Sequence, residues 1–221
     1  PLFSLTALQK QMSNRFGWSS KRTLQAAQRC YETHKILTYP RTSSTCLPND
    51  YVATVDKIVR DFSTHSTYGA SAQFLMKKGR QNEQRVFNDG GVTDHFAIIP
   101  TGEVVPLTGD DEKLFDQVVR RFLSTFFPAA VYEKVTRTTI IANHHFRTGP
   151  LETLTFPGWL SVYDREVESG TDKVLPSLVK DQDQSSNVKV NLAECAAQED
   201  KTKPPPRIGE AKLLSLMENA G

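Results

Sequence analysis

The N-terminal region carries apolar side chains at the spacing of amphipathic helices. Leu5, Leu8 and Met12 share one helical face, and Gly17 then interrupts the pattern. Ser19 or Ser20 can cap a second helix, because a serine hydroxyl accepts a hydrogen bond from a free amide of the first turn. On this second helix the two faces differ in character, with Leu24, Ala27 and Tyr31 on the apolar face and Arg22, Gln25 and Arg29 on the polar one. We therefore predict two helices, the second with a basic outer face.

The second helix is expected to close at residues 33–35. Ile36, Leu37 and Thr38 then form a short extended run that Pro40 stops. A residue that precedes a proline is disfavoured in the α region. Tyr39 is therefore predicted to be extended, where a strand meets a loop, with its ring pointing out of the turn.

Two more helices are predicted before Pro128. One begins near Asn49 and continues with Val52, Val55 and Val59 on one side. The other runs from Glu112 to Phe127, and its apolar stripe consists of Phe115, Val118, Val119, Phe122 and Phe126. We assign this stripe to the core, without a functional role.

Beyond Pro128 the chain is rich in Val, Thr and Ile between Gly and Pro, which is typical of strands and turns. The predicted strands are Val135 to Ala142, Leu151 to Phe156, Trp159 to Tyr163 and Val188 to Leu192, with a polar loop from Asp181 to Asn187. Lys203 and three prolines form a stiff linker to a final helix that carries Leu213, Leu214 and Met217. The predicted fold class is α+β and multidomain.

Composition restricts the class of protein. The 221 residues are 38% apolar and 24% charged, and no apolar run is long enough to cross a bilayer. No signal-peptide pattern is present. Cys30, Cys46 and Cys195 are widely spaced and lack a CxxC motif, which favours neither disulfides nor zinc. We expect an intracellular protein without a membrane partner. Because the chain starts at Pro1 and stops at Gly221 after a helix-like stretch, we expect a piece of a longer protein.

The net charge of +2 conceals an asymmetry along the chain. Residues 1–41 hold seven basic side chains against Glu32 alone, whereas from residue 164 onward eleven acids face eight bases. A polyanion, if bound, should contact the N-terminal end. The alternative is that these basic residues form a solvent-exposed face that binds no polyanion. Charge alone slightly favours this alternative.

Tyr39 and Arg41 form the first candidate for chemistry. A protonated phenol is a weak nucleophile, and a nearby guanidinium favours the phenolate while it neutralises a phosphodiester. Arg41 could hold such a phosphate through two parallel hydrogen bonds, which a lysine could not imitate. Taken alone, the pair fits a half-buried structural tyrosine better than a nucleophile.

His95 lies between Asp94 and a short apolar run, and it is the second candidate. It could donate a hydrogen bond to a phosphate, although a satisfied or solvent-facing histidine is the more common case. His34, His65, His144 and His145 lack partners at ligand spacing. We find no glycine-rich phosphate loop, no HExxH motif and no DxDxE cluster, so no metal site is predicted within this chain.

Several motifs, in order, resemble those of type IA DNA topoisomerases, and most closely those of bacterial topoisomerase III. They are Thr23 to Gln28, Tyr31-Glu32, Leu37-Thr38-Tyr39-Pro40-Arg41-Thr42, His95 before Ala97 to Thr101, and Thr202 to Glu218. The resemblance runs from near Pro1 to Gly221. It implies a helical domain with the active-site tyrosine over residues 1–128, the returning half of a β-arch domain over 129–201, and the start of a helical domain over 202–221.

The resemblance also implies roles for individual residues. Tyr39 matches the nucleophile that forms a 5′-phosphotyrosine bond, Arg41 the arginine that holds the phosphate, and His95 the active-site histidine. The DNA contacts that we predict are Gln28, Arg22, Arg29 and Thr42. The sequence departs from the family pattern at Ser43, Phe96 and Gly209, and Ser43 leaves the bonding around Arg41 open.

The function implied is cleavage and rejoining of one strand of single-stranded DNA, with strand passage, relaxation of negative supercoils and decatenation without ATP. The whole enzyme would use Mg²⁺ bound by an upstream Toprim domain, and no ligand for it is expected in this chain. We therefore predict that the 221-residue chain alone does not relax plasmid DNA. The parent would be a bacterial, cytoplasmic, nucleoid-associated monomer. The alternatives are a DNA-binding or structural module without chemistry, and a phosphotyrosine-forming recombinase, whose further arginine and histidine signatures are not found in order.

Overall fold

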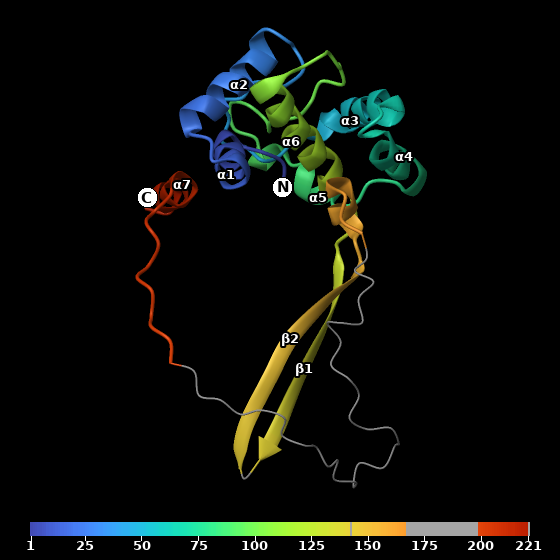
Figure 1. Cartoon of the computed structure of the whole chain (residues 1–221). Coiled ribbons are helices and arrows are strands. Elements are labelled where there is room, and N and C mark those ends of the chain that lie inside the picture. Colours follow the sequence, from blue (N-terminus) through green and yellow to red (C-terminus); the bar gives the residue numbers. More distant parts are fainter. Residues whose placement is uncertain (142, 167–198, 221) are drawn as a thin grey trace. The chain divides into compact units, whose positions relative to one another are not determined.

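The computed structural model describes residues 1–141, 143–166 and 199–220. These residues fall into two compact units. Of the described residues, the first unit comprises 1–131, 156–166 and 208–220, and the second comprises 132–141, 143–155 and 199–207. Figure 1 shows a helical first unit and a long β-hairpin in the second. The α+β character predicted from the sequence is confirmed, and the β part that is described is one two-stranded antiparallel sheet.

The two N-terminal helices form as their caps predict. Helix α1 (Leu5–Phe16) begins after Ser4, whose hydroxyl accepts from the Ala7 amide, and it ends at Gly17, which has a left-handed φ of 66°. Helix α2 (Ser20–Glu32) is capped by Ser19. Its fully buried side differs slightly from the prediction and consists of Thr23, Ala26, Ala27 and Cys30. Leu24 and Tyr31 are only half-buried.

The middle of the first unit contains short helical elements. They are the 3-10 helix η1 (Asn49–Tyr51), α3 (Val52–Asp61), η2 (Phe62–Thr64), α4 (Gly69–Lys78), α5 (Glu83–Val86) and η3 (Asp89–Gly91). The helix predicted near Asn49 is confirmed, with Val55 and Val59 buried. The remaining short elements were not predicted.

Helix α6 (Gly109–Thr125) is the core of the first unit. All five residues of the predicted apolar stripe, from Phe115 to Phe126, are buried. The helix starts earlier than predicted, and its first turn carries Asp110, Asp111 and Glu112. These acids face the positive end of the helix dipole, which favours their charged form. Figure 1 shows α6 crossing the helical unit, and it packs against α2.

The second unit contains a hairpin of β1 (Val131–Ile141) and β2 (His144–Phe156). The two strands predicted from Val135 to Ala142 and from Leu151 to Phe156 are confirmed. Both begin earlier than predicted. Most side chains of β2 are exposed, and Lys134 pairs with Glu152 across the strands at 2.6 Å. Such an exposed pair contributes at most about 1 kcal/mol.

The strand predicted from Trp159 to Tyr163 is wrong. This segment is the 3-10 helix η4 (Gly158–Tyr163), which buries Leu160 and Val162. Gly158 has a φ of 49°, and a Cβ there would lie 2.5 Å from the Ala129 carbonyl oxygen. Only glycine fits this close approach, and it turns the chain out of the strand. The strand predicted from Val188 to Leu192 and the loop from Asp181 to Asn187 lie outside the described residues.

The predicted final helix is confirmed as α7 (Glu210–Glu218). It packs against α1 in the first unit, where Lys10 pairs with Glu218. The Ser20 amide, at the first turn of α2, donates to the Glu210 carboxylate at 2.6 Å. The division into three domains at residues 128 and 201 stays a prediction. No helix among the described residues is long and apolar enough to span a membrane.

Candidate active site

The segment that carries Tyr39 is fixed by the end of helix α2. After Glu32 the chain turns at Lys35, which adopts a left-handed φ of 59°. The Ile36 amide then donates to the Cys30 carbonyl at 2.9 Å. Ile36 and Leu37 are fully buried, and Leu37 forms an antiparallel bridge with Pro100. The short extended run predicted before the tyrosine is therefore confirmed.

Thr38 binds this run to the segment that follows His95. Its amide donates to the Ile99 carbonyl at 3.0 Å. Its hydroxyl accepts from the Ile99 amide at 2.9 Å and donates to the Ala97 carbonyl at 3.1 Å. Because Tyr39 follows Thr38 and His95 lies just before Ala97, these three hydrogen bonds bring the two candidate residues to the same end of the paired segments.

Tyr39 contacts two aromatic side chains. Its ring centre is 4.5 Å from that of the His95 imidazole, and it is 5.4 Å from the ring of Tyr31, which it meets edge to face. Tyr31 comes from α2, and the Lys35 ammonium lies 5.8 Å from the centre of its ring. Tyr39 is half-buried and His95 is exposed. The tyrosine ring thus contacts two aromatic neighbours, and His95 is the more exposed of them.

Arg41 stands between two anchored neighbours. Pro40 and Thr42 are buried, and the Thr42 carbonyl accepts from the Leu5 amide at 2.9 Å. The Arg41 side chain is exposed, and no carboxylate of the described residues pairs with it. Its charge is therefore available to an anion at the surface.

The Thr42 hydroxyl is engaged inside the protein. It donates to the His95 carbonyl at 2.8 Å and accepts from the Ser44 amide at 3.0 Å. Thr42 is 7% exposed, so this side chain holds the His95 backbone in place. The Ser43 hydroxyl, which faces solvent, lies 3.4 Å from that of Thr93. Contact of Thr42 with DNA stays a prediction.

The other predicted DNA contacts lie on α2. Gln28 is half-buried and precedes Tyr31 by about one turn, so both face the same side of the helix. Arg22 binds Asp110 through two hydrogen bonds of 2.8 Å, and Arg29 binds Asp111 at 2.6 Å. The Asp110 hydrogen bond raises the pKa of Arg22, and Arg22 in turn lowers the pKa of Asp110.

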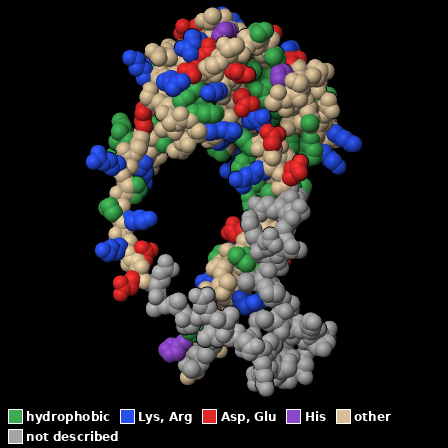
Figure 2. All heavy atoms as spheres, in the orientation of Figure 1, with side chains coloured by type: hydrophobic (Ala, Val, Ile, Leu, Met, Phe, Trp, Pro, Cys, Tyr) green, Lys and Arg blue, Asp and Glu red, His purple; other side chains and the backbone are tan. Residues whose placement is uncertain are grey.

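The basic face predicted on α2 is therefore compensated by the first turn of α6. Figure 2 shows red and blue side chains interspersed over the helical unit rather than a continuous blue surface. The sequence pattern missed this because the acids lie far from α2 along the chain. Contact of Gln28, Arg22 and Arg29 with DNA stays a prediction.

Comparison with known proteins decides the family. Residues 1–221 match the family model described as "DNA topoisomerase". This chain belongs to the type IA DNA topoisomerase family. The family assignment predicted from the ordered motifs is confirmed.

Curated relatives are similar over nearly the whole chain. DNA topoisomerase 3 of Bacillus subtilis (strain 168) is 37% identical over 226 residues, covering 99% of this chain and 30% of the relative. DNA topoisomerase 3 of Bacillus anthracis is 36% identical over 223 residues, again with 99% and 30% covered. The chain thus spans about 30% of the length of these relatives.

A solved topoisomerase structure has a similar fold. Full-length topoisomerase I from Thermotoga maritima aligns with a TM-score of 0.59 and 22% sequence identity, covering 99% of this chain and 34% of that one. At this identity the likeness concerns the fold alone. It supports the helical and hairpin elements described above.

Within this topoisomerase chain the described residues offer no magnesium site. They contain no group of three or more His, Cys, Asp or Glu side chains placed to hold a metal ion. Asp111, the most engaged carboxylate near α2, is already bound by Arg29 and by His34, whose Nε2 lies 3.2 Å away. The side chains in contact with Tyr39 are a phenol and an imidazole, which do not suit Mg²⁺.

Two residues that support the site were not assigned a role from the sequence. Tyr31 was placed on the apolar face of its helix, and Thr38 was predicted only as part of an extended run. The contact between Tyr31 and Tyr39 could not be predicted from the sequence pattern, because it depends on the turn at Lys35. The two residues nevertheless make the contacts that position Tyr39.

Proposed function

We propose that this chain is the part of a topoisomerase III-like type IA enzyme that carries the strand-cleaving tyrosine. The observation that supports it best is the ring contact between Tyr39 and His95, in a chain of this family, two residues before an exposed Arg41 that pairs with no described carboxylate. Nucleophile, hydrogen-bond donor and phosphate-binding cation are the three groups that transesterification of a phosphodiester requires.

In the proposed reaction the Tyr39 hydroxyl oxygen attacks a DNA phosphorus. A bond forms between Tyr39 Oη and the phosphorus, and the bond from the phosphorus to the 3′ oxygen of the preceding nucleotide breaks. The phenolic proton leaves Tyr39, and the released oxygen gains a proton to become a 3′ hydroxyl. The product is a 5′-phosphotyrosine link. Because this link conserves the phosphodiester bond energy, the reverse attack by the 3′ hydroxyl reseals the strand without ATP.

The other residues act on the phosphate. Arg41 binds two of its oxygens and neutralises charge that develops during attack. His95, in ring contact with Tyr39, donates a hydrogen bond to the same group. The helical unit would bind single-stranded DNA through Gln28, Thr42 and the α2 arginines. The whole enzyme would use Mg²⁺, for which the described residues contain no group of three or more His, Cys, Asp or Glu side chains.

The whole protein would pass a second strand through the break, relax negative supercoils and decatenate DNA. The chain spans only about 30% of its curated relatives, so these activities belong to the parent protein. We expect the 221-residue chain alone not to relax plasmid DNA. Relaxation by this chain alone would contradict that expectation.

The test uses the parent protein and a single-stranded oligonucleotide labelled at its 3′ end. Attachment through a 5′ phosphate leaves the labelled fragment on the protein after denaturation, and mass spectrometry of the adduct should identify the Tyr39 peptide. Tyr39→Phe should abolish the adduct, and Tyr132→Phe, an exposed tyrosine of the hairpin, should leave it unchanged. An adduct that persists in Tyr39→Phe would show that the nucleophile is another residue.

The variants Arg41→Ala and His95→Ala help to distinguish an enzyme from a module that binds DNA without cleaving it. Both should lower the rate of adduct formation by about tenfold or more, because each removes a group that stabilises the developing charge. The contrary outcome is a wild type that forms no adduct, while Tyr39→Phe, Arg41→Ala and His95→Ala all bind the oligonucleotide as it does. In that case the chain is a binding module rather than part of an enzyme.

A further inference from the structure

His95 lies on a surface loop of residues 88–97, the His95 loop, whose two ends meet. The first amide of this loop donates to the Leu47 carbonyl and the last amide to the Cys46 carbonyl, each at 2.9 Å. Both ends are thus bound to two consecutive residues of the segment that follows the proposed nucleophile. Short surface loops with close ends are Ω-loops, which frequently carry functional residues.

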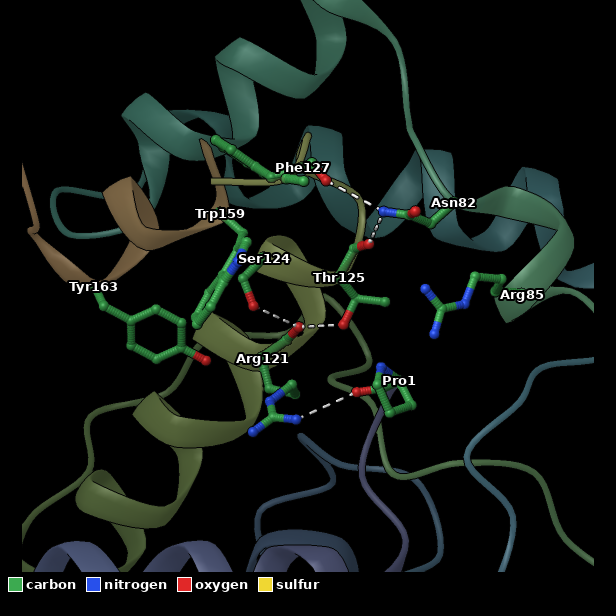
Figure 3. A pocket seen from close by; sticks show the side chains of 10 residues that line it. Pro1, Asn82, Arg85, Arg121, Ser124, Thr125, Phe127, Trp159 and Tyr163 are labelled. Carbon is green, nitrogen blue, oxygen red and sulfur yellow. Dashed lines mark hydrogen bonds between the residues drawn. The ribbon is translucent and has the colours of Figure 1, made fainter. Parts of the chain in front are cut away.

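The chain before the His95 loop is anchored to the core of the first unit. The Asn82 side-chain amide donates to the carbonyl oxygens of Thr125 and Phe127, at 3.1 and 3.2 Å, where α6 ends. Figure 3 shows these two hydrogen bonds. The Leu47 amide also donates to the Val86 carbonyl at 2.8 Å. The loop therefore starts from a fixed point, and the contacts along its length decide where it lies.

Side chains of residues 42–49 hold the His95 loop along its length. In order along the loop, the contacts are those of Thr42 with the His95 carbonyl, Ser43 with the Thr93 hydroxyl, Ser44 with the Gly91 carbonyl and Asn49 with the Asp89 carboxylate. Residue numbers rise in one segment as they fall in the other, so the two segments run antiparallel. Side chains supply here the contacts that a backbone ladder supplies in a sheet.

Ser44 is the most buried of the three hydroxyl residues in this series. It is 3% exposed, against 7% for Thr42, and Ser43 faces solvent. The Ser44 hydroxyl donates to the Gly91 carbonyl at 2.7 Å and accepts from the Cys46 amide at 3.1 Å. A hydrogen bond that is shielded from water is stronger than an exposed one. The bond from Ser44 is therefore the firmest attachment of the middle of the loop.

Gly91 allows the loop to approach this closely. A Cβ at Gly91 would lie 2.7 Å from the Cys46 sulfur and 3.2 Å from the Cys46 Cβ. Both distances are shorter than ordinary contacts between carbon or sulfur atoms, so a side chain here would push the loop away from its partner segment. The place of the loop thus depends on a residue without a side chain and on the serine that binds its carbonyl.

We propose that Ser44 is a positioning residue for the cleavage reaction. By binding the Gly91 carbonyl it holds the His95 loop where the imidazole of His95 contacts the Tyr39 ring. Ser44 acts through His95 rather than on the DNA. The inference rests on the proposed function, since it takes His95 as the group that donates to the phosphate. A displacement of about 1 Å in such a group can slow a reaction on the order of a hundredfold.

The first test measures the maximal rate of adduct formation by the parent protein on the 3′-labelled oligonucleotide. Ser44→Ala should lower this rate about tenfold and leave the oligonucleotide concentration for half-maximal rate unchanged, because no DNA-binding group is removed. The matched control is Ser124→Ala. Ser124 is also buried, and its hydroxyl donates to the Arg121 carbonyl at 3.1 Å near the end of α6 (Figure 3). This control should keep the wild-type rate.

A double variant shows whether Ser44 acts through His95. Ser44→Ala combined with His95→Ala should be no slower than His95→Ala alone, because the loop then carries no imidazole to displace. A serine with a general structural role would instead lower the rate by the same factor whether or not His95 is present.

The second test follows His95 without any cleavage. The histidines of the parent protein are labelled with ¹³C at Cε1, and the His95 signal is the one that His95→Gln lacks. The Tyr39 ring, 4.5 Å away, shifts this signal, and Tyr39→Leu gives its position without the ring. In Ser44→Ala the signal should move toward the Tyr39→Leu position. In Ser124→Ala it should stay where it is in the wild type.

Three outcomes would overturn the proposal. They are a wild-type rate in Ser44→Ala, an unmoved His95 signal in that variant, and equal slowing by Ser44→Ala with and without His95. A wild-type parent that forms no adduct would refute the proposed function, and the His95 signal would still decide whether Ser44 holds the loop. Circular dichroism of each variant shows whether it is folded.

Discussion

The centre of the Tyr39 ring lies 4.5 Å from the centre of the His95 imidazole, with the two planes inclined by 52°. The contact depends on the backbone pairing that precedes the tyrosine. Leu37 bridges Pro100, and the Thr38 hydroxyl binds both Ala97 and Ile99. The Thr38 side chain is thus one of the groups that hold the proposed nucleophile close to the proposed hydrogen-bond donor.

Thr38→Val should therefore affect both stability and cleavage. The variant keeps the shape of the side chain but leaves the Ile99 amide and the Ala97 carbonyl without this partner. We expect a loss of about 1–3 kcal/mol in the free energy of unfolding, measured by urea denaturation. Adduct formation by the parent protein should also slow, since Tyr39 and His95 are held together less firmly. Thr38→Ser retains the hydroxyl and should behave nearly like the wild type. Equal stability and rate in Thr38→Val would disprove this role.

Tyr31 should position Tyr39 without touching DNA itself. Its edge-to-face contact with Tyr39 is worth about 0.5–1.5 kcal/mol, and Tyr31→Phe keeps the ring that makes it. We expect Tyr31→Phe to retain the cleavage rate and Tyr31→Ala to lower the maximal rate severalfold. The oligonucleotide concentration for half-maximal rate should stay the same in both, because binding is not affected. Reduced affinity with an unchanged maximal rate would instead indicate that Tyr31 contacts the DNA.

The helices that could be predicted from the sequence are those with local signals. Ser19 and Gly17 mark the boundaries of α1 and α2, and the phenylalanine stripe marks α6, so each follows from neighbouring residues. The strand predicted at Trp159 failed because a close approach of Gly158 to Ala129 decides the backbone there. That approach is a tertiary contact and leaves no pattern within the segment.

The candidate site was predictable only in part, for the same reason. The chemistry of the single residues favoured structural roles for Tyr39 and His95. Only the motifs that contain them, in their order along the chain, predicted catalytic roles. Their ring contact, and the pairing of Arg29 with Asp111, join segments that are distant in the chain. The charge count along residues 1–41 was correct, but it could not show that α6 supplies the compensating acids.

The pairing of Arg29 and Asp111 gives a direct test of the proposed DNA-binding face of α2. If Arg29 contacts a phosphate, Arg29→Ala should weaken single-strand binding severalfold and reduce the salt slope by about 0.7. Asp111→Asn should act in the opposite direction and strengthen binding, because it frees the guanidinium. Fluorescence anisotropy of a labelled oligonucleotide measures both, with Arg60→Ala as the matched control. Unchanged affinity in Asp111→Asn would place the DNA elsewhere on the unit.

The Glu210 carboxyl should have a pKa below its ordinary value, and its ionisation should change the signal of the Ser20 amide that donates to it. The Ser20 amide donates to the Glu210 carboxylate at 2.6 Å, and this bond lowers the pKa of Glu210 from its ordinary value of 4.5. Since the folded-state pKa is the lower one, the stabilisation that α7 gains is complete above pH 4.5 and is lost as the pH falls through the folded-state value.

The NMR shift of the Ser20 amide should therefore change with pH, with a midpoint below 4.5. Glu210→Gln keeps a hydrogen-bond acceptor but cannot ionise, so the Ser20 shift should lose this titration. Glu199→Gln, an exposed acid outside α7, should leave the titration intact. A midpoint at or above 4.5, or a titration that survives in Glu210→Gln, would show that α7 does not bind the first turn of α2 in solution.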